Sequence, residues 1–505
     1  MKPETNLPAQ DWLYHLFASR HRWLSALAAL ALTVSLAIAG GYLLAEFNPL
    51  YAIAGVAALG LALWMLRDIE VAYWAVIGIA CLFPFASFPF SIGFTPTFLD
   101  AALGALFLAW LLRIMSGRQQ RLETTSLGGP VAVFLLLALV AFLLGLGHAP
   151  LTSYVVRHFA EIILSVTLFF LVVNTVQEPE RLVRLVRALV ICACGAALLG
   201  IVLYVLPDAL TMQLLSALRP FGYPVGPGVL RYIRDDPTLA QRATSTSVDP
   251  NVLGSLLNIA IAITVPQIFA RQPIVHRRYL WPMLGIMTLC LGLTISRGSW
   301  VGLGGALLII AVLRYRKLWW LMLAGAALFL LLPQTQQYAA HFVEGLRIQD
   351  LATQMRIGEY RDALTLIGRY PILGVGFAGS PDIDTYIGVA NLYLLIAEEM
   401  GLVGLTSFLV VMVVFFARFW RARTAAMADE RLEPIWWGLH GAIVGALGGG
   451  IFDHYFFNLD FHHSATLFWL VIGLATAATE IVGETGGRGG RGKREQAFLL
   501  PARRT

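Results

Sequence analysis

Four arginines lie where a membrane protein rarely carries positive charge. Each falls at or near the end of an apolar run that the topology below places on the outer side; they are Arg157, Arg242, Arg297 and Arg356. A cluster of guanidinium groups at a membrane surface is suited to hold a pyrophosphate, because each planar group can donate two parallel hydrogen bonds to phosphate oxygens. The same face is expected to carry Arg219, Arg231, Arg234, Arg347, Arg361 and Arg369. For any single arginine the alternative is a lipid phosphate or an ion pair with Asp235, Asp236, Asp249, Glu344 or Glu359.

Two neighbouring carboxylates, Glu398 and Glu399, interrupt an apolar run that begins at Asn391. Charge within such a run is costly, so these groups are expected to be buried, paired or functional. A base that accepts the proton of an attacking hydroxyl contributes on the order of 10²–10⁴-fold to a rate. Further candidates for this role are Asp453, His454, His341, His462 and His463. For each histidine the alternative is an interfacial side chain that caps a helix or faces lipid headgroups.

Composition indicates that these residues belong to an integral membrane protein. The chain has 505 residues, of which 58% are hydrophobic and 13% charged, and a soluble fold of this length could not bury that much apolar surface. The net charge of +6 is attributed to cytoplasmic Lys and Arg that fix topology, so no nucleic-acid partner is expected. The four cysteines lie in apolar runs without metal or redox spacing, and we expect neither a metal nor a cofactor.

The apolar runs predict an all-α polytopic membrane protein with about fourteen transmembrane helices, each long enough to cross a hydrocarbon layer of roughly 30 Å. The runs lie near 24–47, 49–66, 71–92, 98–115, 130–147, 158–176, 186–206, 251–271, 280–296, 300–314, 318–333, 391–417, 435–455 and 464–482. The first run is too long for a signal-peptide core and is kept as a span. Alternate connections carry clustered arginines, as at Arg181, Arg184 and Arg187, which places both termini in the cytoplasm.

The whole chain, 1–505, is expected to form one integral-membrane domain with two long outer loops, 207–250 and 334–390. In the second loop, apolar residues recur every three to five positions between 350 and 370, which predicts an amphipathic helix that ends before Pro371. The glycine-rich segment that follows indicates a tight loop. The Gly- and Arg-rich tail, 484–505, is predicted to be disordered and cytoplasmic and to touch membrane lipids.

Several fragments within residues 240–415 resemble the O-antigen ligase family, which is related to the Wzy-type polysaccharide polymerases. Two of them are Asp249-Pro250-Asn251, which opens a helix, and the short turn from Thr294 to Trp300. The others follow in order along the second loop: Arg356-x-x-x-Tyr360-x-x-Ala363-Leu364, Tyr370-Pro371-Ile372-Leu373-Gly374-Val375-Gly376, Asn391-x-Tyr393-Leu394 and Glu399-x-Gly401-Leu402-x-Gly404-Leu405.

The resemblance implies an enzyme of the bacterial cytoplasmic membrane that acts at its outer face. It implies transfer of a glycan from an undecaprenyl-pyrophosphate carrier to the hydroxyl of a saccharide or lipid-linked acceptor. The donor-phosphate ligands implied are Arg242, Arg297 and Arg356, with Arg157 as a further member, and the supporting residues are Tyr360, Asn391, Tyr393, Asp249, Asn251, Asp453 and His454. A sugar pyrophosphate is already activated, so neither a nucleotide nor a metal is required if fixed cations stabilise the departing charge.

The chain departs from the family pattern at one position. The ligases carry a histidine immediately before the asparagine of the Asn-x-Tyr-Leu motif, and this chain has Ala390 there. The base is therefore open among Glu399, which matches a family position, its neighbour Glu398, the pair Asp453 and His454, and the histidines His341, His462 and His463. The missing histidine favours a polymerase or exopolysaccharide enzyme over a lipid A core ligase.

Two other classes of protein are alternatives. A transporter or flippase of lipid-linked saccharides tends to place ionisable groups and broken helices at mid-membrane in paired halves. Here the ionisable residues gather at the outer ends of the runs and the two halves differ, which favours the enzyme. An inactive scaffold of the same fold would tolerate replacement of the arginines.

Overall fold

The computed structural model describes residues 34, 49–91, 93–117, 119, 122–148, 150–331, 351–379 and 388–498. The chain divides into two units, Met1–Asp68 and Ile69–Thr505. In the first unit the structure describes one main element, the apolar helix α3 (Pro49–Arg67). His341, Glu344 and Arg347, which the sequence singles out, lie outside the described residues.

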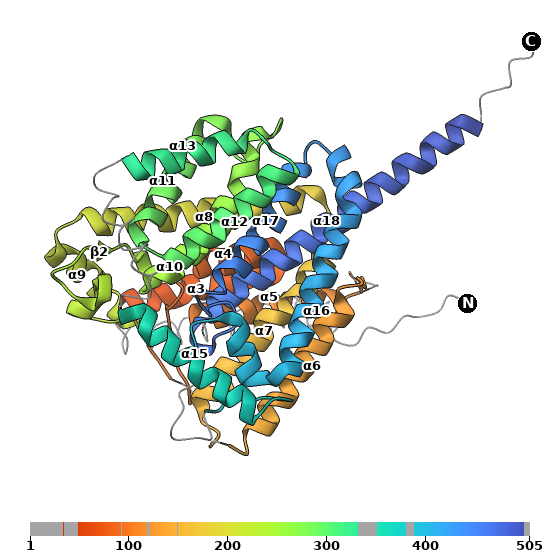
Figure 1. The fold of residues 1–505 in the computed structure, drawn as a ribbon. Coiled ribbons are helices and arrows are strands. Elements are labelled where there is room, and N and C mark those ends of the chain that lie inside the picture. The colour runs from red at the N-terminus through yellow and green to blue at the C-terminus, as the bar shows by residue number, and fades with distance from the viewer. Residues whose placement is uncertain are drawn as a thin grey trace, which may run out of the picture. The chain divides into compact units, whose positions relative to one another are not determined.

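The second unit is almost entirely helical in its described part (Figure 1). Its α-helices are α4 (Ile69–Leu82), α5 (Phe98–Met115), α6 (Gly128–Gly145), α7 (Ser153–Thr175), α8 (Pro179–Val205), α9 (Asp208–Ser216), α10 (Pro250–Thr264), α11 (Arg277–Thr294), α12 (Arg297–Leu313), α13 (Leu318–Leu331), α15 (Leu351–Arg369), α16 (Leu392–Ala428), α17 (Glu433–Gly449) and α18 (His462–Phe498). The prediction of an all-helical protein is confirmed. The helix α18 extends into the segment for which composition predicts disorder, and that disorder stays a prediction.

One small sheet interrupts the helices. Strands β1 (Arg231–Tyr232) and β2 (Gln241–Arg242) pair antiparallel, with Arg231 opposite Arg242. Two-residue strands are too short to show an alternating pattern, so the sequence does not reveal them. Their consequence is local, because the pairing holds Arg242 at a fixed place on the loop between α9 and α10.

Seven helices of the described chain are long and apolar enough to cross a membrane. They are Phe98–Met115, Gly128–Gly145, Ser153–Thr175, Pro179–Val205, Pro250–Phe269, Leu392–Ala428 and Leu459–Glu484. Shorter apolar helices include Arg297–Leu313 and Leu318–Ala327. The protein is thus an integral membrane protein, and the count of fourteen spans stays a prediction.

Two helices form the centre of the second unit. The apolar windows of Leu459–Glu484 and Pro250–Phe269 are 94% and 83% buried, whereas those of α5 and α6 are 28% buried, so α5 and α6 lie at the periphery. The helix α18 packs along α7, where the hydroxyls of Ser165 and Thr466 are 2.8 Å apart. The helix α10 packs on α17, where Asn258 donates to the Gly445 carbonyl at 2.9 Å.

The amphipathic helix α15 packs on α16 and buries Ala363 and Leu366 (teal and blue in Figure 1). Its bounds agree with the helix predicted over 350–370, and it ends at Arg369, before Pro371. Close to this contact α16 is broken at Gly401, where φ is +68° and ψ is −175°. A Cβ at this position would overlap the carbonyl oxygen of Ile372, so only glycine fits.

Candidate active site

Arg242 is held by groups at the end of one helix, α11, and at the start of another, α10. Its Nε donates to the Thr294 carbonyl at the end of α11 (2.8 Å), and one Nη donates to the Asn251 side-chain oxygen at the start of α10 (2.6 Å). Burial lowers its pKa, and the carboxylate of Asp249 opposes that shift. A guanidinium keeps its charge even so, because its ordinary pKa lies above 12. The site therefore fixes one permanent positive charge with two of its donor positions engaged.

The motif Asp249-Pro250-Asn251 acts as a cap. The side chain of Asp249 accepts from the amides of Asn251 (2.7 Å) and Val252 (3.1 Å) and so begins α10. The hydroxyl of Tyr455, from the loop between α17 and α18, donates to Asp249 at 3.3 Å and accepts from the side-chain nitrogen Nδ2 of Asn251 at 3.5 Å. Burial raises the pKa of Tyr455 well above its usual value, so this hydroxyl stays a donor. Tyr455 thereby ties that loop to the arginine-bearing segment.

The backbone is strained at two β-branched residues beside these contacts. Val248 has φ +59° and ψ −37°, and Ile295 has φ +54° and ψ +31°. Positive φ at a β-branched residue is rare and costs on the order of 1–3 kcal/mol, and such strain concentrates at functional sites. Val248 directly precedes the cap at Asp249, and Ile295 lies two residues before Arg297. The strained residues therefore lie at the start of α10, six residues after Arg242, and in the turn that leads to Arg297.

Arg297 is the first residue of α12 and is half-buried. The start of α12 packs against the turn that carries Asp453: a Cβ on Gly298 would lie 2.9 Å from the Phe452 Cβ and 3.2 Å from an oxygen of Asp453. Glycine at 298 thus allows α12 to approach this turn closely. The turn between α11 and α12 is shorter than the predicted segment from Thr294 to Trp300: it consists of Ile295 and Ser296, and Arg297 to Trp300 belong to α12.

Arg356 forms an ion pair with Asp453. One Nη lies 3.4 Å from the Asp453 carboxylate, and the two side chains are 27% and 15% exposed. Burial raises the pKa of Asp453 to about 7, while Arg356 and Arg242 both act to lower it and Asp249 acts to raise it. Arg356 and Arg242 are therefore both within electrostatic range of one carboxyl group that titrates near neutrality.

A dense set of hydrogen bonds joins α15, the start of α16 and the turn after α17. Tyr360 donates to the Ile451 carbonyl (3.2 Å), and the side chain of Asn391 also donates to that carbonyl (2.8 Å) while it caps α16. Tyr393 donates to the Leu447 carbonyl at 2.9 Å. The amide of Ala390 donates to Glu359 at 3.1 Å. The motif residues of the second loop thus meet the 451–454 turn, which the sequence could not show.

His454 is bound to the segment just before Ala390. Its Nδ1 lies 2.8 Å from the Val389 carbonyl oxygen, which can only accept, so Nδ1 carries the proton. Burial lowers the pKa of His454, and the ring is therefore neutral at pH 7 with Nε2 free of a proton. This is the protonation state that a general base requires.

Glu398 and Glu399 lie in a different layer. Both side chains are buried, at 1% and 4% exposure, beside the loop that follows α15. Their backbone carbonyls accept from the amides of Val375 and Gly376 at 2.9 Å. Both carboxylate oxygens of Glu398 and one of Glu399 have no hydrogen-bond partner among the described residues. The structure does not bring these carboxylates into contact with the Arg356–Asp453 pair, and their catalytic role stays a prediction.

Arg157 lies in a separate cluster. Its Nε donates to Glu161 at 2.8 Å and an Nη lies 3.4 Å from Asp100, while the guanidinium stands 5.9 Å from the centre of the Phe94 ring. Arg157 is thus engaged in ion pairs, which is the alternative to phosphate binding that the sequence leaves open for any single arginine. Glu161 is not among the residues predicted from the sequence, although a carboxylate four residues from an arginine within an apolar run is a signal for such a pair.

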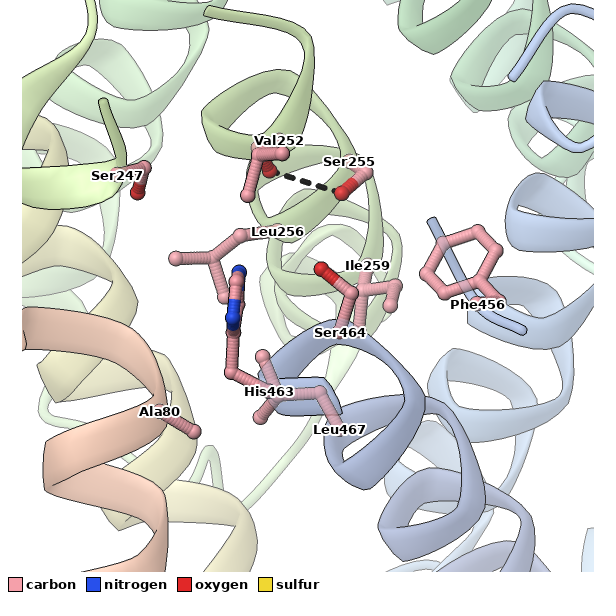
Figure 2. A pocket seen from close by; sticks show the side chains of 10 residues that line it. All are labelled: Ala80, Ser247, Val252, Ser255, Leu256, Ile259, Phe456, His463, Ser464 and Leu467. Carbon is pink, nitrogen blue, oxygen red and sulfur yellow. Dashed lines mark hydrogen bonds between the residues drawn. The ribbon is translucent and has the colours of Figure 1, made fainter. Parts of the chain in front are cut away.

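A small cavity lies between α10 and α18. It has a volume of about 10 Å³ and is lined by Ser247, Ser255, His463, Ser464 and Leu256, among others (Figure 2). Figure 2 shows the ring of His463 beside Leu256, and both ring nitrogens lack a hydrogen-bond partner among the described residues. The lining is mostly apolar, with the three serines and His463 as its polar members, and the cavity is about the size of one water molecule. His463 therefore belongs to this cavity and not to the arginine-bearing turns.

The fold and these contacts define a polytopic helical membrane protein with a cationic polar site, built where the ends of α10, α11, α12, α16 and α17 meet. Residues 282–409 match a family model described as O-antigen ligase. The match includes Arg297, Arg356 and the motif residues that contact the 451–454 turn, and it lies within the predicted core of 240–415. It supports assignment of the chain to the O-antigen ligase family, as an O-antigen ligase or polymerase type of membrane enzyme. A comparison with curated proteins gives no match.

Proposed function

We propose that the protein transfers a glycan from an undecaprenyl-pyrophosphate carrier to an acceptor hydroxyl at the outer face of the bacterial cytoplasmic membrane. It acts as an O-antigen or exopolysaccharide polymerase or as a ligase. The observation that carries this proposal is that Arg242 and Arg356, from separate segments, both act on the carboxyl of Asp453, and that the start of α12, which carries Arg297, packs against the same turn. The O-antigen ligase match supports the class of reaction.

The arginines hold the pyrophosphate and stabilise the charge that develops on it. Fixed cations in a partly buried site act more strongly than in water and need no reorganisation when the bond breaks. Arg356 is paired with Asp453 before substrate binds, so the anionic donor competes with that carboxylate for the guanidinium. This chemistry needs neither a nucleotide nor a catalytic metal.

His454 is the base that accepts the proton of the acceptor hydroxyl. Its neutral ring, with Nδ1–H bonded to the Val389 carbonyl, presents Nε2 as the proton acceptor. It stands next to Ala390, the position at which the family carries histidine. Asp453 holds Arg356 in place. Glu398 and Glu399 remain the other candidates for the base; their backbone carbonyls hold α16 against the glycine-rich loop.

The site faces the outer side, in a chain with fourteen spans, cytoplasmic termini and outer loops at 207–250 and 334–390. The alternation of basic connections supports this topology. The seven long apolar helices and the shorter ones are compatible with it. A transporter of lipid-linked saccharides and an inactive scaffold are the alternatives that the following experiment separates.

The test uses purified protein in nanodiscs with an undecaprenyl-pyrophosphate oligosaccharide and an acceptor, without nucleotide or added metal. Release of undecaprenyl pyrophosphate and the length of the glycan are followed for the wild type, Arg297→Ala and Arg356→Ala. Each replacement is expected to lower the rate on the order of 10²-fold or more, as loss of one charge-stabilising donor does. Arg278→Ala is the matched control, since Arg278 is exposed and stacks on Tyr279 at the start of α11.

A lengthening ladder of glycans would identify a polymerase, and a single transfer to a lipid acceptor a ligase. Absence of carrier release with every acceptor offered would contradict the enzyme and favour a transporter or scaffold. Equal rates for Arg356→Ala and Arg278→Ala would remove the arginines from the mechanism.

A further inference from the structure

A second polar cluster lies away from the arginine-bearing turns, among three helices that are distant in sequence. Asp100 is in the first turn of α5, Glu161 is on α7, and His462 is the first residue of α18. One ligand atom from each of these residues lies within 4.8 Å of the others. Spacing along the chain predicts no metal site, because residues so far apart in sequence come together only through the packing of the helices.

The cluster is enclosed and one of its acceptors has no partner. Glu161 and His462 are 2% and 3% exposed. Oε1 of Glu161 accepts from Arg157, but Oε2 has no hydrogen-bond partner among the described residues. This oxygen lies between two imidazoles, 3.1 Å from Nδ1 of His158 and 3.5 Å from Nδ1 of His462. Arg157 is bonded to the other oxygen of Glu161, so Oε2 remains able to bind a further cation on the side that faces Nδ1 of His462.

We propose that Asp100, Glu161 and His462 bind a divalent transition-metal ion, with Zn²⁺ as the best match. One imidazole and two carboxylates are a ligand set that zinc accepts, with bonds of about 2.0–2.2 Å. Two ligands at that length in a tetrahedral site lie about 3.4 Å apart, which agrees with the 3.5 Å between Glu161 and His462. Arg157 and the Thr97 amide bond to Oδ2 of Asp100 and leave Oδ1 for the ion.

The ion has a structural role that is distinct from the proposed transfer reaction. It joins α5, α7 and α18, and His462 directly follows the 3₁₀ turn Leu459–Phe461 at the end of the loop that carries Asp453, His454 and Tyr455. The Leu459 carbonyl is also bonded to His158 at 3.0 Å. Metal binding would thus anchor one end of the loop on which the active site depends, without contact to the donor.

The test measures metal content, not activity. Untagged full-length protein in detergent is stripped with a chelator, loaded with ZnCl₂ and freed of excess ion, and zinc per chain is measured by mass spectrometry together with the midpoint of thermal unfolding. The wild type is expected to retain one zinc ion per chain and to unfold at a higher temperature when loaded. Glu161→Gln, His462→Gln and the more exposed Asp100→Asn are each expected to lose zinc affinity by about tenfold or more.

His463→Gln is the matched control, because this neighbouring buried histidine lines the separate cavity of Figure 2 and is expected to leave zinc binding unchanged. Size-exclusion profiles select the variants that fold, and three substitutions at three ligands keep the test decisive if one fails. The zinc site would be overturned if the wild type retained no zinc, or if the ligand variants bound zinc as well as His463→Gln does. A proton shared between Asp100 and Glu161 would then account for the cluster.

Discussion

Asp453 and His454 are neighbours in sequence but are held in opposite electrostatic situations. The carboxyl of Asp453 is paired with Arg356 and its pKa lies near 7, whereas burial keeps the His454 ring neutral with one nitrogen engaged. A base must be unprotonated and free to accept at working pH. His454 meets that condition while Asp453 is engaged with a cation, which supports the proposal that His454 accepts the proton and Asp453 positions Arg356.

Replacement of His454 by Gln is expected to lower the rate of carrier release by about 10²–10⁴-fold, because the base is lost. Gln keeps an amide donor for the Val389 carbonyl, so the loop should stay in place. Introduction of Ala390→His into this variant is expected to restore part of the rate, because residue 390 adjoins the same carbonyl. A His454→Gln enzyme with the wild-type rate would exclude His454 as the base and return the role to Asp453 or Glu399.

Asp453→Asn is expected to change the pH dependence of stability. The folded-state pKa of Asp453, about 7, lies above the unfolded value of 3.8. Between these two pH values the native state binds more protons than the unfolded state. The stability of the wild type therefore falls as pH rises through this interval. The asparagine of the variant does not titrate, so the variant does not lose stability for this reason as pH rises. The unfolding temperature of the variant relative to wild type should therefore rise from about pH 5 to about pH 7 and then level off. A constant difference across this range would show that Asp453 titrates normally.

The identity of several site residues follows from sequence, but their partners do not. A cap such as Asp249-Pro250-Asn251 is a local feature, and arginines at the ends of apolar runs conflict with the usual distribution of charge. The contact of Tyr455 with Asp249 spans more than two hundred residues and depends on how α10 and α17 pack. No spacing rule gives such a contact, which is why Tyr455 was missed.

At the scale of elements, the break in α16 at Gly401 allows this helix to contact Ile372, in the segment that follows the amphipathic helix α15. Gly401→Ala is expected to destabilise the protein by at least about 1–3 kcal/mol, because alanine at φ +68° is strained and its Cβ would overlap the Ile372 carbonyl. Gly305→Ala is the control: Gly305 lies in α12 with nothing within 4 Å of an added Cβ, so alanine should be neutral or raise helix stability by up to about 1 kcal/mol.

The measurement is the unfolding temperature of both variants in detergent, with the yield of monodisperse protein as a second readout. If Gly401→Ala unfolds at the temperature of Gly305→Ala, the close contact between α16 and the loop after α15 is not part of the native state. The spacing of apolar residues predicted the bounds of α15 to within a residue or two. It could not identify α16 as the surface on which Ala363 and Leu366 are buried.

At the scale of the whole molecule, the spans that hydropathy predicts and the helices that the structure describes differ in length. The seventeen residues of α12 are at the lower end of the length that spans a bilayer, and α13 is described over fourteen residues, up to the last one before the range that the structure leaves undescribed. Hydropathy averages over a window and does not register where a turn, such as that at Ile295 and Ser296, ends one helix and begins the next. The predicted spans and the observed helices therefore agree in position more closely than in length.

The orientation of the molecule can be tested with one cysteine before α10 and one after it, because the predicted topology places these two positions on opposite sides of the membrane. Thr238 lies in the connection between β1 and β2, Gln272 precedes α11, and both are exposed. The predicted topology places Thr238 outside, because it belongs to the outer loop, and Gln272 inside, in a connection rich in arginine. In a chain whose four native cysteines are replaced by alanine, a membrane-impermeant thiol reagent should label Thr238→Cys in intact cells and Gln272→Cys only after permeabilisation. The reverse pattern would place the arginine-bearing turns in the cytoplasm, and a donor presented at the outer face could not reach them.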